Sequence, residues 1–204
     1  MVARAVQQYI SAGVAGYHIE DQIQQKRCGH LAGKEVVDLE SYLQRIRAAK
    51  AEAVRRNSDI VLIARTDALQ SRGYDECVVR MRAARDLGAD VGIIEGFTTK
   101  EMAARAVQDL APWPLLLNSV ENGASPIITV QEAQDYGFRL MIFSFASLAP
   151  AYTAIKACFM RILTEGVTGT ANDLTPKKMF EVCGLAVSIK IDEEAGGTAF
   201  LKGV

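Results

Sequence analysis

The stretch Asp86-Leu-Gly-Ala-Asp-Val-Gly-Ile-Ile-Glu95 decides the fold, because it joins the end of a helical pattern to a short apolar strand. The same unit recurs at residues 10–21 and at residues 135–144. In each copy a glycine stands between the two parts, where it caps the helix in the left-handed conformation without steric cost. The repetition predicts helices that alternate with strands. The capping glycines are Gly13, Gly88 and Gly137.

Five short runs of mainly Val, Ile and Leu lack the polar alternation of half-exposed strands, which is typical of strands buried on both faces of a parallel sheet. The segments between them have the apolar spacing of helices that bury one face. This alternation indicates right-handed crossovers and an α/β fold. The predicted strands lie near Gly16–Glu20, Ile60–Arg65, Val91–Glu95, Leu115–Asn118 and Leu140–Phe143. The predicted helices lie near Leu39–Arg56, Asp75–Leu87, Lys100–Leu110, Val130–Tyr136 and Ala149–Glu165.

Two architectures fit this alternation: an open, doubly wound sheet, and a partial (β/α)8 TIM barrel with about five of the eight βα units. No glycine-rich phosphate loop follows any strand, so a nucleotide-binding sheet is not favoured. Polar side chains follow every predicted strand, and in a barrel they would all meet on one face and line one site. The partial barrel is therefore favoured, with strand ends at Glu20, Asp21, Arg65, Asp67, Glu95, Asn118 and Ser144.

The pattern changes after residue 165. It predicts a partial barrel catalytic domain over residues 1–166, followed by a C-terminal helical extension and tail over residues 167–204. Thr175 is expected to cap a helix whose first turn holds Pro176. The glycine-rich tail over residues 192–204 is expected to be extended or mobile.

Composition excludes several classes of partner. The chain has 204 residues, 50% of them hydrophobic, and a formal net charge of -1, which gives no reason to expect nucleic acid or an anionic membrane surface. The longest apolar run, Leu140–Ala151, is too short to span a bilayer, and residues 1–10 do not resemble a signal peptide. The four cysteines lack Cys-x-x-Cys spacing. They are expected to be reduced thiols of a cytoplasmic or, alternatively, a mitochondrial protein.

The segment Lys26-Arg-Cys-Gly-His30 is the strongest local signal of chemistry. Two cations and a nearby histidine should favour the thiolate of Cys28, which could act as a nucleophile or as a general acid/base. Gly29 allows the backbone to approach a ligand closely. The alternative is an exposed basic loop with an incidental cysteine.

Two further strand ends carry charge. Glu20 and Asp21 could hold a magnesium ion, since hard cations prefer oxygen ligands, but paired acids are also often caps or salt-bridge partners. Arg65 is well placed to bind a carboxylate, and the alternative is a structural pair with Asp67. Asn118 precedes a loop of small residues that includes Ser125, which by itself is merely a loop.

Taken together, these segments resemble the isocitrate lyase and phosphoenolpyruvate mutase superfamily over most of the chain. Three motifs stand in the order and approximate spacing of 2-methylisocitrate lyase-like enzymes: Gly16-Tyr-His-Ile-Glu-Asp-Gln22, Lys26-Arg-Cys-Gly-His30 and Ile63-Ala-Arg-Thr-Asp-Ala68. The second resembles the gating loop of carbon–carbon lyases, in which the cysteine is a general acid/base. The phosphonate-forming mutases lack this cysteine, so the resemblance argues against mutase chemistry.

The resemblance implies a role for each matching residue. Glu20 would belong to the site of a magnesium ion, or alternatively of manganese, and would act through a water. Cys28 would exchange a proton with an enolate-like intermediate, and Arg65 would bind a substrate carboxylate or the developing enolate oxygen. The implied catalytic residues are Cys28, His30, Arg65 and Glu95, and the implied substrate-binding residues are Gly29, Asn118, Ser125 and Ser144.

Position 144 narrows the expected activity. Methylisocitrate lyases resemble one another in having proline there, and isocitrate lyases in having threonine, whereas Ser144 resembles fungal oxaloacetate acetylhydrolases. The segments 180–185 and 195–197 are similar to the same fungal group. The resemblance thus implies hydrolysis of oxaloacetate to oxalate and acetate, with Ser144 binding the hydrated carbonyl. The alternative is a 2-methylisocitrate- or dimethylmalate-type lyase, in which Ser144 would only cap a strand end.

The family's first strands, which carry the principal aspartate ligands of magnesium, have no counterpart in this chain. Five strands cannot close an eight-stranded barrel. We therefore expect the chain alone to bind magnesium poorly and to have little or no activity, and an inactive, truncated member that binds a dicarboxylate is the competing class. The resemblance also implies a small di- or tricarboxylate substrate and a homotetramer that exchanges helices near Ala149–Glu165.

Overall fold

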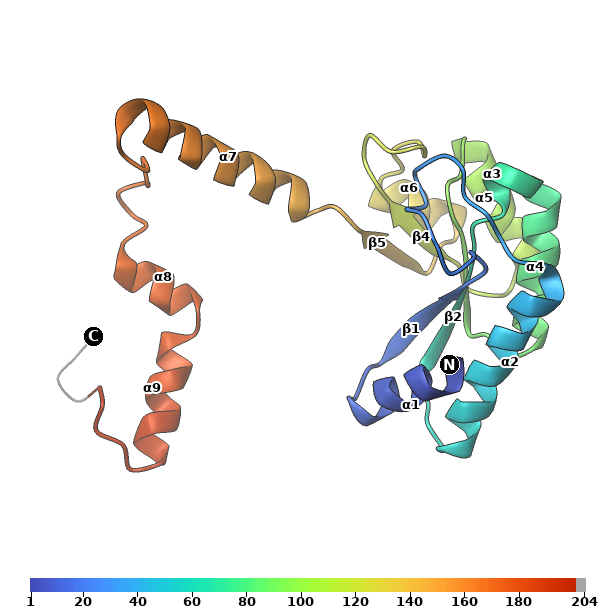
Figure 1. Cartoon of the computed structure of the whole chain (residues 1–204), viewed down its shortest axis with the longest axis horizontal. Coiled ribbons are helices and arrows are strands. Elements are labelled where there is room, and N and C mark those ends of the chain that lie inside the picture. The colour runs from blue at the N-terminus through green and yellow to red at the C-terminus, as the bar shows by residue number, and fades with distance from the viewer. Residues whose placement is uncertain (201–204) are drawn as a thin grey trace. The chain divides into compact units, whose positions relative to one another are not determined.

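The computed structural model describes residues 1–200, and contacts divide the chain into two compact units (Figure 1). Unit 1 is Met1–Ala146 and unit 2 is Ser147–Val204. The boundary predicted from the sequence lies later, at residue 166, and the assignment of a catalytic domain to residues 1–166 stays a prediction. The strands of unit 1 are β1 (Gly16–Glu20), β2 (Val61–Thr66), β3 (Val91–Ile94), β4 (Leu116–Ser119) and β5 (Leu140–Phe143). Its helices are α1 (Val2–Ser11), α2 (Leu39–Arg55), α3 (Leu69–Arg72), α4 (Tyr74–Asp86), α5 (Lys100–Leu110) and α6 (Val130–Tyr136).

All strand pairs of unit 1 are parallel. β1, β2 and β3 form one sheet in that order, β4 and β5 form a second, and a parallel bridge between Gly92 and Leu115 connects β3 to β4. Each strand agrees with its predicted position to within one residue at either end. The predicted α/β fold with parallel sheets is therefore confirmed. The described residues do not form a closed barrel.

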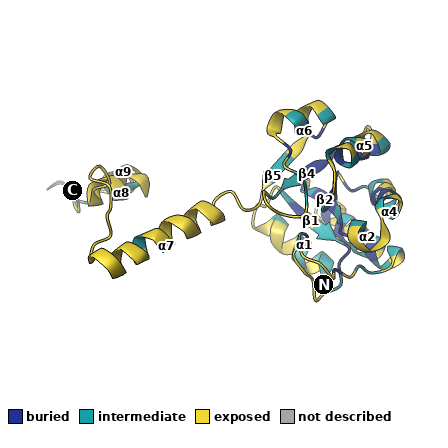
Figure 2. Ribbon diagram, turned by 90° about the horizontal axis from the view of Figure 1, so that it is seen from above, coloured by how far each residue is buried: buried dark blue, intermediate teal, exposed yellow. Residues whose placement is uncertain are grey.

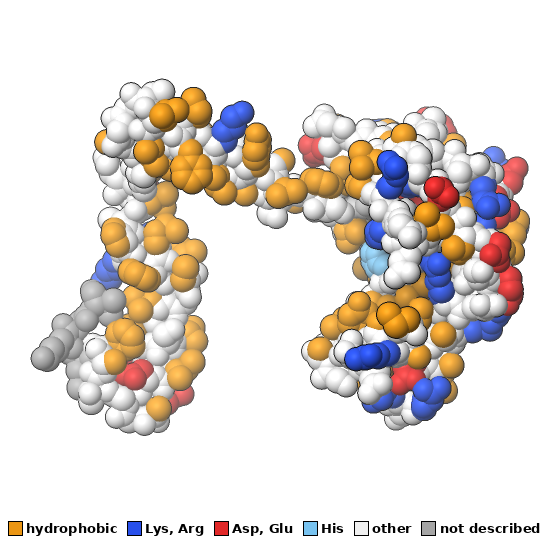
Figure 3. Space-filling view, viewed as in Figure 1, with side chains coloured by type: hydrophobic (Ala, Val, Ile, Leu, Met, Phe, Trp, Pro, Cys, Tyr) orange, Lys and Arg blue, Asp and Glu red, His pale blue; other side chains and the backbone are white. Residues whose placement is uncertain are grey.

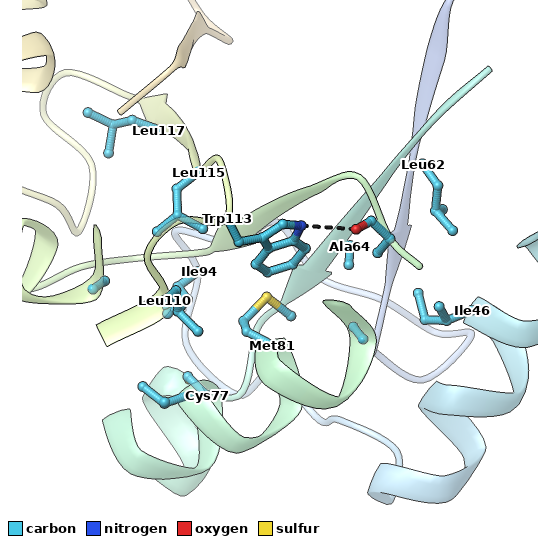
Figure 4. Packing of buried hydrophobic residues seen from close by; sticks show 14 of the residues in the cluster. Ile46, Leu62, Ala64, Cys77, Met81, Ile94, Leu110, Trp113, Leu115 and Leu117 are labelled. Carbon is cyan, nitrogen blue, oxygen red and sulfur yellow. Dashed lines mark hydrogen bonds between the residues drawn. The ribbon is translucent and has the colours of Figure 1, made fainter. Parts of the chain in front are cut away.

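One face of the sheets packs against the helices and carries the main hydrophobic core (Figure 4). The indole of Trp113 lies against Gly92 of β3, where an added Cβ would collide with the ring. Its Nε1 donates to the carbonyl of Ala89 at 2.9 Å, so the buried N–H has a partner. Around it lie fully buried residues from α2, α4, the strands and the end of α5, among them Ile46, Leu62, Met81, Leu110 and Leu115.

The opposite face of the sheets carries a second apolar cluster formed by Ile63, Val91, Ile93 and Leu116. Successive residues of a strand point to opposite faces, so Leu62 enters the first cluster and Ile63 the second. Because both faces of the sheet are apolar, the strands read as continuous apolar runs in the sequence.

The predicted glycine caps are also confirmed. Gly13, Gly88 and Gly137 have φ angles of +72°, +91° and +99°, a region that other residues rarely adopt. Each follows a helix directly, or one residue after its C-cap, and precedes the chain's entry into the next strand. The recurring unit of the sequence is thus a helix, a left-handed glycine and a parallel strand.

Unit 2 contains three helices, α7 (Leu148–Glu165), α8 (Pro176–Val182) and α9 (Leu185–Glu194). Thr175 caps α8 by accepting a hydrogen bond from the Lys178 N–H, with Pro176 in the first turn, as predicted. The predicted extended tail is wrong at its start, because α9 continues through residues 192–194, and its last residues, 201–204, lie outside the described part. Residues 147–200 include none that is buried (Figure 2). None of the described helices combines the length and apolar character needed to cross a bilayer.

Candidate active site

A cavity of about 210 Å³ lies in unit 1, where the strands reach their carboxyl ends. One side comes from the loop after β1, and the rest comes from residues at or just beyond the ends of β2, β3, β4 and β5. The structure therefore brings together most of the side chains that the sequence singled out. The lining residues are Lys26, Arg27, Cys28, Gly29, His30, Arg65, Glu95, Asn118, Val120, Ser144 and Phe145.

A continuous series of polar contacts crosses the strand ends. Arg65 Nη1 lies 3.3 Å from Glu95 Oε2, and the Asn118 side-chain amide donates to both oxygens of Glu95 at 3.1 and 3.2 Å. The Ser144 hydroxyl donates to Asn118 Oδ1 at 2.6 Å. Since parallel strands end at the same edge, residues far apart in the sequence become neighbours. This places a cation, a carboxylate, an amide and a hydroxyl side by side.

Arg65 is held by Asp67 through two hydrogen bonds, from Nε at 2.8 Å and from Nη2 at 2.9 Å. Burial alone would raise the pKa of Asp67, but the hydrogen bonds and charge of Arg65, with the charge of Lys34, hold that pKa below its ordinary value. The structural Arg–Asp pair considered from the sequence is therefore present. Arg65 also lines the cavity, and its Nη1 lies 3.3 Å from Glu95 Oε2, while its role in binding a substrate carboxylate stays a prediction.

Asp21 supports the strand ends from within the protein. Its carboxylate accepts hydrogen bonds from the Asp67 N–H at 2.8 Å, the Thr66 hydroxyl at 2.6 Å and Arg80 Nη1 at 3.2 Å. Burial raises the pKa of Asp21, against the effect of these hydrogen bonds and of the Arg80 charge. Asp21 is fully buried, so it matches the salt-bridge alternative for the acid pair and is directed away from the cavity.

Arg80 was missed by the sequence reasoning. It lies on α4 between Cys77 and Ala84, on the face where Cys77, Met81 and Ala84 are completely buried. An arginine in the apolar stripe of a helix requires a buried acid. The position of Arg80 on the apolar face of α4 could therefore have indicated, from the sequence, that a carboxylate packs against this helix.

Cys28 lies at the mouth of the cavity in an exposed part of the chain. We call residues 22–34 the Cys28 loop. One of the cations that flank the thiol, Lys26, forms an ion pair with Glu20 at 2.8 Å. The other, Arg27, lines the cavity with Cys28. Cys28, Lys26 and Arg27 thus line the same cavity, whereas the predicted effect of the cations on the thiol and its catalytic role stay predictions.

His30 connects the Cys28 loop to the loop after β4. Its Nδ1 accepts a hydrogen bond from the Ala124 N–H at 3.0 Å, so the proton of a neutral ring is assigned to Nε2. Nε2 lies 3.2 Å from Glu95 Oε1, although the two atoms are not aligned for a hydrogen bond. Ser125 is half-buried beside Ala124 and does not line the cavity, so the structure does not bring it to the other candidate residues.

Glu20 is the residue predicted to bind a metal. Its carboxylate faces Lys26 Nζ at 2.8 Å and Arg65 Nε at 3.6 Å. Over residues 1–200 no three side chains of His, Cys, Asp or Glu gather as metal ligands. Magnesium requires several oxygen ligands, and two cations beside one carboxylate oppose its binding. The described residues therefore do not fit a magnesium site on their own, and no step below is assigned to a metal.

The fold and the cavity define an α/β protein with a polar cavity at the carboxyl ends of parallel strands. Residues 1–163 match the family model described as phosphoenolpyruvate phosphomutase. The chain therefore belongs to this family, within the phosphoenolpyruvate mutase/isocitrate lyase superfamily.

Solved structures and curated relatives agree with this assignment. A structure of oxaloacetate acetylhydrolase in complex with the inhibitor 3,3-difluorooxalacetate matches with a TM-score of 0.95 and 64% identity, over 98% of this chain and 67% of that one. A structure of 2,3-dimethylmalate lyase matches with a TM-score of 0.97 and 55% identity, over 100% and 68%. The 2-methylisocitrate lyase of Escherichia coli is 34% identical over 172 residues, which is 84% of this chain and 57% of that enzyme. The chain spans about half the length of the first curated relatives that it matches.

Proposed function

We propose that the chain carries the site of an enzyme that cleaves a carbon–carbon bond in a small oxo or hydroxy dicarboxylate, with oxaloacetate as the substrate. The observation that carries the proposal is the Ser144 hydroxyl, 2.6 Å from Asn118 and in the same cavity as Cys28. A hydroxyl and an amide beside an arginine suit a substrate with a hydrated carbonyl between carboxylates. The 64% identity to an oxaloacetate acetylhydrolase supports the same substrate.

The proposed reaction is the hydrolysis of oxaloacetate to oxalate and acetate. Arg65 Nη1 binds one carboxylate, and Ser144 with Asn118 binds the gem-diol formed when water adds to the carbonyl. Loss of a proton from the gem-diol breaks the bond between C2 and C3, which releases oxalate and leaves the enolate of acetate. Solvent water accepts the proton that the gem-diol loses. The Cys28 thiol then donates a proton to the enolate carbon, and the resulting thiolate takes a proton back from solvent.

A lyase that acts on a dimethylmalate-type or 2-methylisocitrate-type substrate is the second candidate. The solved 2,3-dimethylmalate lyase has the higher TM-score, 0.97, and its match extends over the whole chain. The same Cys28 and Arg65 would serve this reaction, whereas the Ser144 hydroxyl would have no hydrated carbonyl to bind. Position 144 therefore separates the two candidates.

NMR detection of products from oxaloacetate, 2-methylisocitrate and dimethylmalate, each with magnesium, tests the proposal. The panel is run on this chain and on any longer form that the gene encodes. Because Glu20 alone does not fit a metal site, we expect little turnover by this chain and full turnover by a longer form. Oxalate and acetate from oxaloacetate would support the hydrolase, and products from dimethylmalate alone would favour the second candidate.

Substitution of Ser144 sharpens the test. Ser144→Ala removes one hydroxyl from the site and is expected to lower kcat for oxaloacetate by about 100-fold or more. Ser119→Ala is the matched control, because Ser119 ends β4 beside Asn118 but does not line the cavity. Equal activity of the two variants would contradict the role proposed for Ser144.

We also propose that unit 1 is part of a (β/α)8 barrel. Its support is the strand order, which follows the chain without reversal, whereas a doubly wound sheet reverses its order at a switch point. The exposed apolar side chains of α7 suit the exchange of this helix between copies of the chain, and we propose that the copies form a homotetramer.

A further inference from the structure

The backbone on each side of Cys28 is fixed by a buried polar side chain. On one side Gln22 bonds Arg27 twice: its Oε1 accepts from the Arg27 N–H at 2.9 Å, and its Nε2 donates to the Arg27 carbonyl at 3.0 Å. On the other side Lys34 Nζ donates to the Gly29 carbonyl at 2.6 Å. Cys28 itself is exposed, so its position depends on these neighbours more than on packing of its own side chain.

Lys34 is unusual because its ammonium is buried, with 2% of the side chain exposed. Burial of a charge is costly unless the charge is paired and hydrogen-bonded. The carboxylate beside it is Asp67, whose Oδ1 lies 3.5 Å from Nζ. Lys34 therefore joins the Gly29 carbonyl of the Cys28 loop to the carboxylate that holds Arg65.

Gly29 shows how closely the loop approaches Arg65. A Cβ built on Gly29 would lie 2.8 Å from Arg65 Nη2 and 2.5 Å from Glu95 Cγ, so the backbone itself forms the contact. A shift of this backbone by one ångström would move the Cys28 thiol relative to a ligand held by Arg65. Proton transfer requires the donor within hydrogen-bond reach of the reacting atom.

We propose that Lys34 is a positioning residue, which holds the Gly29 carbonyl against Asp67 and thereby sets the position of Cys28 relative to Arg65. Gln22 fixes the preceding residue and is the second anchor of the same arrangement. The proposal deepens the proposed function, since it assumes that Cys28 acts on a ligand bound at Arg65.

Hydrogen exchange measured by mass spectrometry tests the anchor without requiring turnover. Lys34→Met keeps an unbranched side chain through the ε position and removes the ammonium. We expect amides of residues 22–33 to exchange about tenfold faster or more, among them the Leu31 N–H that donates to the Cys28 carbonyl. Exchange in β2 and β3 should stay unchanged. The control is Lys50→Met, which removes an exposed ammonium 3.4 Å from the Asp90 carboxylate.

Kinetics separate positioning from a general structural role. In an active form of the protein, Lys34→Met is expected to lower kcat about tenfold while KM changes less than about twofold, because Arg65 still binds the substrate carboxylate. A rise in KM with an unchanged kcat would overturn the proposal.

The pattern of hydrogen exchange in Lys34→Met tests whether Lys34 holds the Cys28 loop. Unchanged exchange in residues 22–33, or faster exchange throughout unit 1, would overturn the proposal. Faster exchange confined to the loop supports it. If neither this chain nor any longer form that the gene encodes then turns over a member of the panel, the proposed function fails while the anchor stands. If Lys34→Met does not fold, Gln22→Met gives the decision: a loop-confined increase supports the arrangement and no increase overturns it.

Discussion

Units 1 and 2 both contain helices with large apolar side chains, but these side chains are buried in unit 1 and exposed in unit 2. In unit 1 the large side chains of α2 and α4, such as Ile46 and Met81, are completely buried. In unit 2 Tyr152, Phe159 and Leu163 of α7 are 63%, 66% and 78% exposed. Figure 3 shows hydrophobic side chains on the surface of this unit. Caps and apolar spacing suffice to specify a helix, whereas burial requires a second apolar surface, and unit 1 supplies one in its sheets.

The core of unit 1 provides the largest expected effect. Trp113→Ala should lower the free energy of unfolding by about 3–5 kcal/mol, because it leaves a cavity above Gly92 and removes the partner of the Ala89 carbonyl. Urea unfolding followed by circular dichroism measures the change. Phe159→Ala in α7 is the control and should change the unfolding of unit 1 by less than about 0.5 kcal/mol. Similar losses for both variants would remove the distinction between the units.

The buried Arg65–Asp67 pair gives the next largest effect, and this effect depends on pH. The pKa of Asp67 is lower in the folded than in the unfolded protein, so its contribution to stability is complete above the unfolded pKa, about 3.9, and is lost as the pH falls. Asp67→Asn should cost about 2–3 kcal/mol at pH 7, and the difference from the unsubstituted protein should shrink below about pH 4.

Urea unfolding at pH 7, 5 and 3 measures this difference. Asp173→Asn, at an exposed position of unit 2, is the control and should show no difference at any pH. A cost of Asp67→Asn that is equal at pH 7 and pH 3 would contradict the assignment of a buried, ionised Asp67.

Removal of a helix cap should give the smallest change in the free energy of unfolding. Because each unit has a threonine cap, the same substitution can be compared between the two units. Thr129 caps α6 and Thr175 caps α8, each accepting a hydrogen bond from a backbone N–H three residues later. Thr129→Ala should cost about 1 kcal/mol in the unfolding of unit 1, because the Ala133 face of α6 is buried there. Thr175→Ala should leave that free energy unchanged and lower only the helical signal in circular dichroism. A loss of unit 1 stability in Thr175→Ala would show that the two units unfold together.

Local patterns predicted the elements of the fold well. The strand Val91–Ile94 and the cap at Gly88 were visible from apolar runs and glycines alone, because both depend on neighbouring residues. The unit boundary after Ala146 was not visible in the sequence, because α7 has the same kind of apolar spacing as the helices of unit 1. Whether such a helix is buried depends on surfaces that its own sequence does not contain.

Some residues of the candidate site could be predicted from local sequence, and others could not. The strand ends and the Cys28 loop were found from the sequence, and a resemblance to known enzymes assigned their roles. The supporting residues Lys34 and Arg80 were not found, because their partners Asp67 and Asp21 lie 33 and 59 positions away. A charged side chain inside a buried stretch indicates that a partner exists, but the fold alone identifies it.

The packing of Trp113 on Gly92 gives the chain an intrinsic fluorescent probe of unit 1. The chain contains one tryptophan, so its tryptophan emission originates from the core of unit 1. An indole in an apolar environment emits at shorter wavelength than one in water. In a purified sample, the wavelength of that emission thus reports whether unit 1 is folded, without any attached dye.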